Sequence, residues 1–442
     1  MIALPVRTWR DGSIANFDIR CFRNFSLIIP ARCQGLRIIR GKIIITRTKH
    51  TLAKLPRDFR LFLAATFLFG FSQSIVDSTF NNFLNETYLI DNLQRGILEI
   101  PRELPGLLVV AVSAIVFFLC SRRQAALANL LCAFGILLIG FYSPNFSVML
   151  IWLFIFSIGQ HLFLPLNQSI GMELAVKGQT GRRLGQFSAV ANVAMIIGSF
   201  SIFVGFQYFD LDFKTSYFAA FLGFSSVAVL IFMMKKDEPV PVRMKFNLRK
   251  EYTLYYWLTV LYGTRKQLFL TFAPWVLVTV FHQKTQVVAT LLTVGCVIGI
   301  FFKPMLGKAI DKLGERIILA SEAVILVFVC IGYGFSKSIF AETTALYAVF
   351  VCYIVDQMLA AVSMARATYL QKIAVRPEDV SQTLTMGVSI DHIFSIGIAV
   401  LGGFIWLKFG YQYLFLTGAV IAVLNFFSAL QIKTKTEKLM TP

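Results

Sequence analysis

Apolar runs of 18 or more residues recur along the chain from Leu61 onward, and short polar links separate them. An α-helix of about 20 residues, rising about 1.5 Å per residue, crosses the hydrocarbon part of a bilayer. The pattern therefore predicts an all-α polytopic membrane protein with twelve transmembrane helices. The predicted helices span residues 61–84, 97–120, 124–142, 146–166, 184–206, 217–234, 252–276, 287–306, 317–335, 344–369, 380–407 and 411–430.

One interior link, KKDEPVPVRMKFNLRKEY at 235–252, is longer than the others and divides the helices into two sets of six. It is polar and basic and carries two prolines, which is typical of a linker. The two sets repeat weakly, because an offset of 193 residues places Gly70 over Gly263. The predicted segments are a basic extension at 1–60, a first half at 61–234, a linker at 235–251, a second half at 252–430 and a tail at 431–442.

Composition supports a membrane protein, because 57% of the 442 residues are hydrophobic and only 15% are charged. The net charge of +19 would indicate nucleic acid in a soluble domain, but Lys and Arg also collect on the cytoplasmic side of membrane proteins. Here the predicted loops on the side of the two termini hold 16 cations, and the other loops hold five. We therefore expect both termini in the cytoplasm, a prokaryotic inner (plasma) membrane and no nucleic-acid partner. The five cations of the other loops are Arg95, Lys214, Lys284, Lys337 and Lys408.

The extension at 1–60 carries 13 Lys and Arg against three acids. Two interpretations stay open. It is either a basic, partly amphipathic arm that lies on anionic lipid, or upstream sequence included by a misplaced start. We expect it to be disordered under either interpretation.

A polar loop, GKAIDKLGER, separates the eighth and ninth predicted helices. Its glycines allow close helix approach, and its acid can pair with the end of a neighbouring helix. In a chain with twelve spans it resembles the G-x-x-x-D-[RK]-x-G-[RK]-[RK] loop of the major facilitator superfamily, with Glu315 departing at one basic position. The residues that carry the resemblance are Gly307, Asp311, Lys312, Gly314 and Arg316.

The resemblance implies a fold with two six-helix halves, in which helices 1, 4, 7 and 10 line a central cavity. It also implies a latch between Asp311 and the start of helix 5, where Arg182 and Arg183 lie. The chain departs from the family pattern at two places. The matching loop of the first half, FFLCSRRQAA, lacks the acid and the glycines, and helix 5 lacks the G-x-x-x-G-P-x-x-G-G pattern, which counts against drug efflux.

Buried polarity concentrates on the four helices that would line the cavity. Arg265 and Lys266 lie near the middle of the seventh helix, where each charge costs roughly 2.5–3.5 kcal/mol unless it faces protein or water. Adjacent residues diverge by about 100°, so either one meets the solute and the other an acid, or both pair with acids. The predicted solute-binding residues are Asp77, Gln160, His161, Arg265, Lys266, Asp356, Gln357 and Arg366.

Two further clusters of ionisable residues interrupt the apolar runs. Asp391 and His392 on helix 11 are predicted to exchange protons, since His titrates near neutrality. Glu99, Arg102 and Glu103 on helix 2 have the i, i+3, i+4 spacing of an intrahelical ion pair, and we interpret them as structural.

No catalytic constellation, Walker loop or Cys/His ligand spacing occurs, so we expect no enzyme, no cofactor and no metal site. The leading hypothesis is a monomeric secondary transporter of a small polar, anionic solute, coupled to protons. One alternative is a proton-coupled exporter of amphipathic or cationic compounds, with Asp77 and Asp356 as ligands. Another is a membrane sensor that transports nothing.

Overall fold

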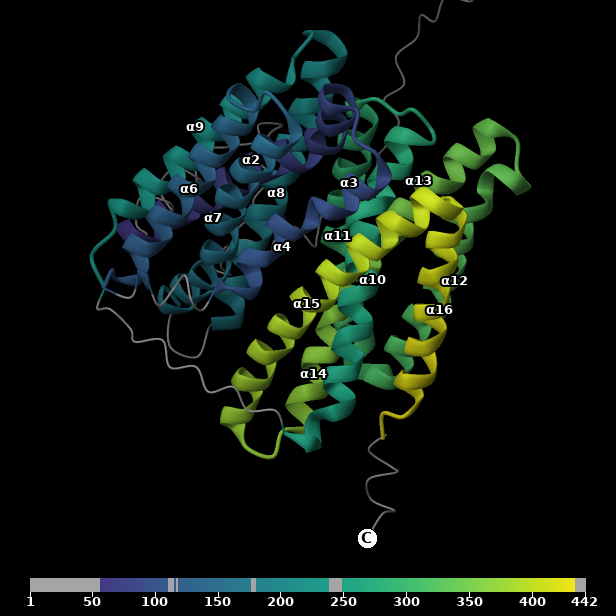
Figure 1. Ribbon diagram of the computed structural model, residues 1–442. Coiled ribbons are helices and arrows are strands. Elements are labelled where there is room, and N and C mark those ends of the chain that lie inside the picture. Colours follow the sequence, from purple (N-terminus) through teal and green to yellow (C-terminus); the bar gives the residue numbers. More distant parts are fainter. Residues whose placement is uncertain (1–55, 110–114, 117, 176–179, 238–248, 434–442) are drawn as a thin grey trace, which may run out of the picture. The chain divides into compact units, whose positions relative to one another are not determined.

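The structure is a computed structural model that describes residues 56–109, 115–116, 118–175, 180–237 and 249–433 (Figure 1). Every regular element that it describes is a helix, and residues 55–442 form one unit. The first half contains α2 (Arg57–Phe83), the π-helix η2 (Leu84–Tyr88), α3 (Asn92–Ile97), α4 (Glu99–Leu107), α6 (Ser121–Phe141), α7 (Phe146–Glu173), α8 (Thr180–Tyr208) and α9 (Phe213–Phe232).

The second half repeats this order after the linker. Its elements are η3 (Lys250–Tyr252), α10 (Thr253–Thr279), α11 (Thr285–Leu313), α12 (Glu315–Ile339), α13 (Glu342–Leu359), η4 (Ala360–Val362), α14 (Ser363–Ile373), α15 (Pro377–Phe409) and α16 (Tyr411–Leu430).

The predicted fold class, an all-α membrane protein with twelve helices, is confirmed. Helix 2 contains α3 and α4, and helix 10 consists of α13, η4 and α14. Ten helices in the described part of the chain are long and apolar enough to span a membrane. The segments that fall short are α10 and the pair α3 and α4, which hold several charged residues in an otherwise apolar interior.

The start of helix 2 corrects the sequence-based placement of Arg95 in an outer loop. The Asp91 side chain accepts a hydrogen bond from the Gln94 N–H at 2.7 Å, and the Gln94 side chain bonds back to Asp91. This capping box begins the helix at Asn92 rather than at Ile97. Arg95 is therefore fully buried, with its Nη1 2.6 Å from Glu99 Oε1.

Side-chain caps also stabilise the N-termini of two other helices, α9 and α7. Asp212 caps α9 by accepting the Thr215 N–H at 2.8 Å, and Asn145 caps α7 in the same way through Val148. The hydrogen bonds from the Thr215 side chain and backbone lower the pKa of the Asp212 carboxyl.

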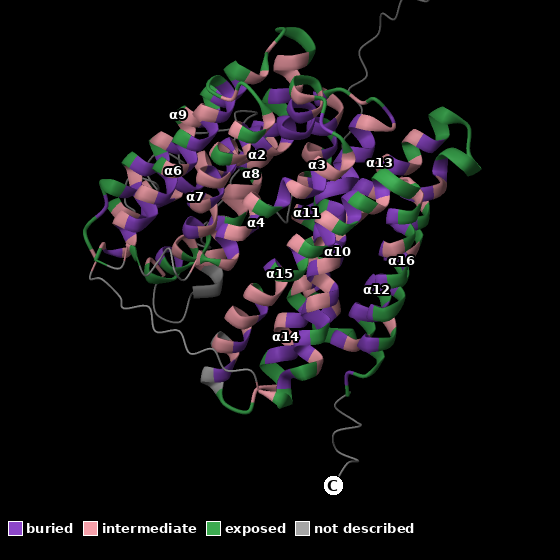
Figure 2. Ribbon diagram, in the orientation of Figure 1, coloured by how far each residue is buried: buried purple, intermediate pink, exposed green. Residues whose placement is uncertain are grey.

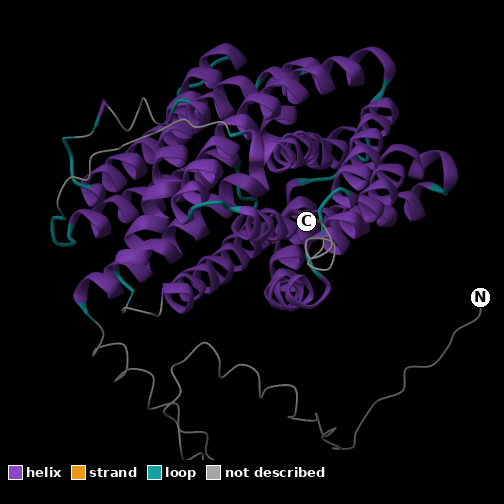
Figure 3. Cartoon of the chain, turned by 90° about the horizontal axis from the view of Figure 1, so that it is seen from below, coloured by secondary structure: helices purple, strands orange, loops and turns teal. Residues whose placement is uncertain are grey.

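The helix ends define two faces of the unit (Figures 1 and 3). The linker face carries the start of α2, residues 233–237 and the end of α16, and the opposite face carries the loops at 209–212 and 280–284. On the opposite side α15 packs against α3 and α4, and α8 packs against α11. There the Ser199 and Thr293 hydroxyls lie 2.8 Å apart, and the Asn82 amide donates to the Gln283 carbonyl at 3.0 Å.

The two halves separate toward the linker face. A methyl group added at Gly185 of α8 or Gly307 of α11 would meet no atom within 4 Å. The linker-side helix α14 packs mainly against α10, α12 and α15 of its own half. The arrangement is closed at the opposite face and open toward the linker face.

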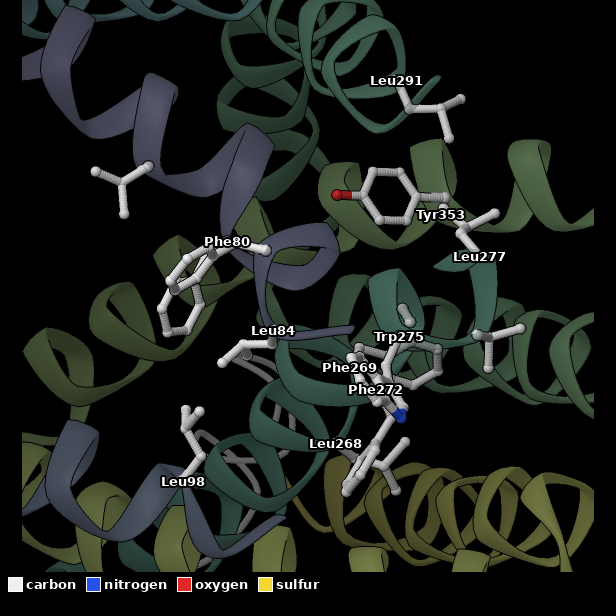
Figure 4. Close-up of a cluster of buried hydrophobic side chains, with 14 of the residues drawn as sticks. Phe80, Leu84, Leu98, Leu268, Phe269, Phe272, Trp275, Leu277, Leu291 and Tyr353 are labelled. Atoms are coloured by element: carbon white, nitrogen blue, oxygen red, sulfur yellow. The ribbon is translucent and has the colours of Figure 1, made fainter. Parts of the chain in front are cut away.

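A hydrophobic cluster joins the halves where they meet. Figure 4 shows Phe80 and Leu84 of the first half beside Phe269 and Trp275 of α10. Large apolar side chains also cover the outside of the bundle; Phe328, for example, is 68% exposed. Exposed positions recur along outer helices such as α12 and α16 (Figure 2). This surface fits lipid, because apolar side chains in contact with acyl chains need no burial by protein.

Candidate functional site

A cavity of about 370 Å³ lies between the halves. Its walls come from α2, α4, α6 and α7 on one side and from α10, α11 and α13 on the other. The aromatic side chains on the wall are Phe80, Phe156, Phe269 and Tyr353. The other polar and charged side chains are Gln73, Asp77, Asn81, Arg102, Gln160, Asp356 and Gln357. Four of the predicted solute-binding residues, Asp77, Gln160, Asp356 and Gln357, therefore lie on its wall.

Hydrogen bonds orient the polar side chains of the first half. The Gln160 amide donates to Gln73 Oε1 at 2.5 Å, and the Gln73 amide donates to Asp77 Oδ1 at 2.9 Å. The chain of bonds ties α7 to α2 and holds the Asp77 carboxyl at the wall. In the described part of the chain no cation lies within ion-pair distance of Asp77, although Arg102 interacts with it at longer range.

Arg265 and Lys266 point to different helices, as the angle between adjacent residues requires. Arg265 Nη2 lies 2.7 Å from Asp356 Oδ1 of α13, and Lys266 Nζ lies 2.5 Å from Asp391 Oδ2 of α15. The geometry matches the second sequence alternative, in which both cations pair with acids. Each pair neutralises a charge that would otherwise be costly in the membrane.

The charged cluster of helix 2 reaches beyond its own helix. The expected intrahelical pair is present, with Arg102 Nη1 3.3 Å from Glu99 Oε1. Glu99 Oε2 also accepts a hydrogen bond from the Gln267 amide of α10 at 2.9 Å. Glu103 Oε2 lies 2.8 Å from His392 Nδ1 of α15, and Arg102 lines the cavity.

Sequence reasoning missed this role of helix 2. Three ionisable groups within five residues offer more charge than one intrahelical pair satisfies. The surplus therefore had to find a partner on a facing helix. The adjacent Asp391 and His392 of helix 11 could have indicated that partner, because they are also ionisable residues within an apolar helix.

The structure places His161 beside His392. Their ring centroids are 5.1 Å apart, and His161 Nδ1 lies 3.0 Å from the Ser157 carbonyl oxygen. Arg366 lies nearer the linker face, where its guanidinium is 3.4 Å from the Tyr262 ring centroid and 3.9 Å from Glu322 Oε2. These two predicted binding residues thus have partners of their own.

The predicted gating motif forms the joint between α11 and α12. Gly314 connects them with φ of 84°, and Asp311 and Lys312 are exposed. Glu315, the residue that departs from the pattern, is buried and pairs with Lys372 of α14 at 2.6 Å. The remaining motif residues, Gly307 and Arg316, belong to α11 and α12.

The corresponding loop of the first half also forms ion pairs with neighbouring helices, which the sequence did not reveal. Buried Arg122 pairs with Asp58 of α2 at 3.0 Å and with Glu173 of α7 at 2.6 Å. The Arg183 guanidinium stacks on Phe59, 4.1 Å from the ring centroid. The Arg182 side chain lies outside the described residues, so the latch with Asp311 stays a prediction.

Comparisons with known proteins identify the family and the fold. The family model of the Major Facilitator Superfamily matches residues 62–389. A nucleoside transporter, NupG, superposes with a TM-score of 0.71 at 12% identity, covering 85% of this chain and 100% of that chain. A POT family transporter in complex with 5-aminolevulinic acid gives 0.68 at 12% identity, with 87% and 100% covered. A D-xylose-proton symporter gives 0.64 at 13% identity, with 86% and 98% covered. Comparison with curated protein sequences finds no match.

Proposed function

Because the chain belongs to the Major Facilitator Superfamily, we propose that it is a secondary transporter that moves a small polar solute by alternating access. The observation that carries this proposal is the cavity of about 370 Å³, which has polar and charged side chains on its wall and lies between two halves that meet at one face. Its volume lies within the range of about 300–1,000 Å³ typical of small-molecule sites. Transport requires the contacts at the opposite face to break while contacts form at the linker face.

The charges around the cavity favour a solute without net charge. The sequence-based expectation of an anion relied on Arg265 and Lys266, but each of them is paired with an acid. Asp356 on the wall is neutralised by Arg265, which leaves one cation, Arg102, and one acid, Asp77, on the wall. Amides can bond hydroxyl or amide groups, and the aromatic rings can stack on an apolar face of the solute.

The runner-up is transport of a cationic compound. It is favoured by Asp77, whose side-chain partner is the neutral amide of Gln73. A positively charged solute at the cavity wall would supply the missing counter-charge. An anion stays the third alternative, with Arg102 as its partner.

We assign proton coupling to Asp77, because a half-buried carboxylate without a paired cation costs less when it carries a proton. Asp77→Asn should keep exchange of solute but abolish accumulation driven by a pH gradient. The proton exchange predicted for Asp391 and His392 stays a prediction. In the structure Asp391 is paired with Lys266, and His392 with Glu103.

The distribution of cations supports an orientation with the linker face in the cytoplasm. In that orientation the arrangement is inward-open, and we propose that the protein acts as a monomer. A prokaryotic plasma membrane as its location is part of the same proposal.

Flux into proteoliposomes tests the proposal. The probes are uridine and D-xylose as neutral solutes, succinate as an anion and tetraethylammonium as a cation, each with and without a pH gradient. We expect saturable uptake of a neutral probe that Gln160→Ala weakens. Saturable uptake of the cation or the anion alone would move the assignment to that alternative, and no saturable uptake by folded protein would favour the sensor.

A further inference from the structure

Three side chains that can bind metal ions converge between the halves, away from the wall of the cavity. Glu103 comes from α4, His161 from α7 and His392 from α15, so the cluster joins two helices of the first half to one of the second. Their ligand atoms all lie within 4.8 Å of one another. Glu103 and His392 are only 5% and 8% exposed.

The surrounding contacts orient the two rings for a ligand. His161 Nδ1 lies 3.0 Å from the Ser157 carbonyl oxygen, so this nitrogen donates its proton there and leaves Nε2 with a free lone pair. His392 Nδ1 lies 2.8 Å from Glu103 Oε2. A metal-bound histidine usually donates its other ring N–H to a carbonyl oxygen or a carboxylate, as His161 does to Ser157. Glu103 Oε2 and His392 Nδ1 are instead close to the separation of two ligand atoms on one ion. Gly106 leaves the space that the two rings share, since a Cβ there would overlap both.

We propose that Glu103, His161 and His392 form a binding site for a transition-metal ion such as Zn²⁺, which clamps the two halves together. Imidazole and carboxylate ligands suit Zn²⁺, with a water in the fourth position. Bonds of about 2.0–2.2 Å place ligand atoms about 3.3 Å apart, so the side chains must draw in slightly. No local ligand spacing marks this site in the sequence, because the three residues lie on separate helices.

Two cations lie near the site, and each is paired with an acid outside it, although Arg102 shares Glu99 with Arg95. Lys266 and Arg102 both interact electrostatically with Glu103. Lys266 is bound to Asp391 at 2.5 Å, and Arg102 to Glu99 at 3.3 Å. These pairs reduce the repulsion that a divalent ion would meet.

The site is specific to one arrangement of the halves. Glu103 and His392 lie on α4 and α15, which pack together in this structure, where the opposite face is closed. An ion that needs both ligands therefore stabilises that closed arrangement and inhibits alternation. At a free concentration 100 times its Kd, it would shift the equilibrium toward this state about 100-fold.

The test measures Zn²⁺ binding to the purified full chain by competition with a chromophoric chelator, after removal of bound metal with EDTA. We expect one Zn²⁺ per chain at a site that His161→Asn or His392→Asn weakens at least tenfold. His282→Asn is the matched control, because this exposed histidine lies in the loop after α10. If His392→Asn does not fold, the loss of Zn²⁺ affinity in His161→Asn is the test of the site.

Two results would overturn the proposal. Wild-type protein that binds less than one Zn²⁺ per chain would remove the site. Binding that survives in both histidine variants but falls in His282→Asn would assign the metal to the loop. Neither result depends on solute transport, so the metal site and the transport proposal fail separately.

Discussion

Replacing Gly96 by alanine should destabilise the closed opposite face, where the two halves meet. Gly96 of α3 packs against the backbone of α15, where a Cβ would lie 3.1 Å from the Ala399 carbonyl carbon and 3.3 Å from Gly403 Cα, and closer still to the Ala399 carbonyl oxygen. The clash is with backbone atoms, so no side-chain rotation relieves it. Gly96→Ala should therefore penalise the closed opposite face by about 1–3 kcal/mol, the usual cost of overpacking.

This penalty applies only to the arrangement in which α3 and α15 touch. Since about 1.4 kcal/mol is a factor of ten, the equilibrium should shift roughly 5- to 150-fold toward an open opposite face. Gly397→Ala on α15 is the matched control, because a Cβ there meets no atom within 4 Å. Both changes remove a helical glycine, so their difference isolates the contact with α15.

Spin-label distances measure the shift. One pair of labels at Pro144 and Thr343 reports on the opposite face, and another at Lys236 and Lys312 reports on the linker face, all at exposed positions. In Gly96→Ala we expect the first distance to lengthen and the second to shorten, with Gly397→Ala like the parent. Identical distance distributions in both variants would refute the idea that this contact sets the arrangement.

Three further predictions test the charges and the orientation. Arg265→Gln should lower the free energy of unfolding by about 3 kcal/mol, because it leaves Asp356 without its cationic partner. The double change with Asp356→Asn should recover part of this loss, and thermal unfolding in detergent measures both variants. Cysteines at Pro144 and Lys284 should react with an impermeant maleimide added outside the cell and one at Lys236 should not, and the reverse pattern would invert the orientation. Asp311→Asn should shift the equilibrium further toward an open linker face and slow turnover, and unchanged spin-label distances with unchanged turnover would exclude the latch.

The fold was predictable because each crossing is long and apolar and each link is short. The ends of the helices were less predictable, because they depend on local caps. The capping box at Asp91 moved the start of helix 2 and buried Arg95, which the apolar pattern alone places in a loop.

The site was predictable only in part. Polar residues in apolar helices marked Asp77 and Asp356, both of which lie on the cavity wall. The pairing of Glu103 with His392 depends on how the two halves pack, which no local pattern encodes. The rotation of α7 likewise decides that Gln160 faces the cavity while His161 faces His392.

Locking the opposite face shut tests the central claim, that a solute crosses only if the two halves alternate around the cavity. The Ser199 and Thr293 hydroxyls lie 2.8 Å apart across the halves, close enough for a disulfide after replacement of both by cysteine in a cysteine-free background. Oxidation should abolish solute flux in proteoliposomes, and reduction should restore it. Undiminished flux through fully cross-linked protein would contradict the account.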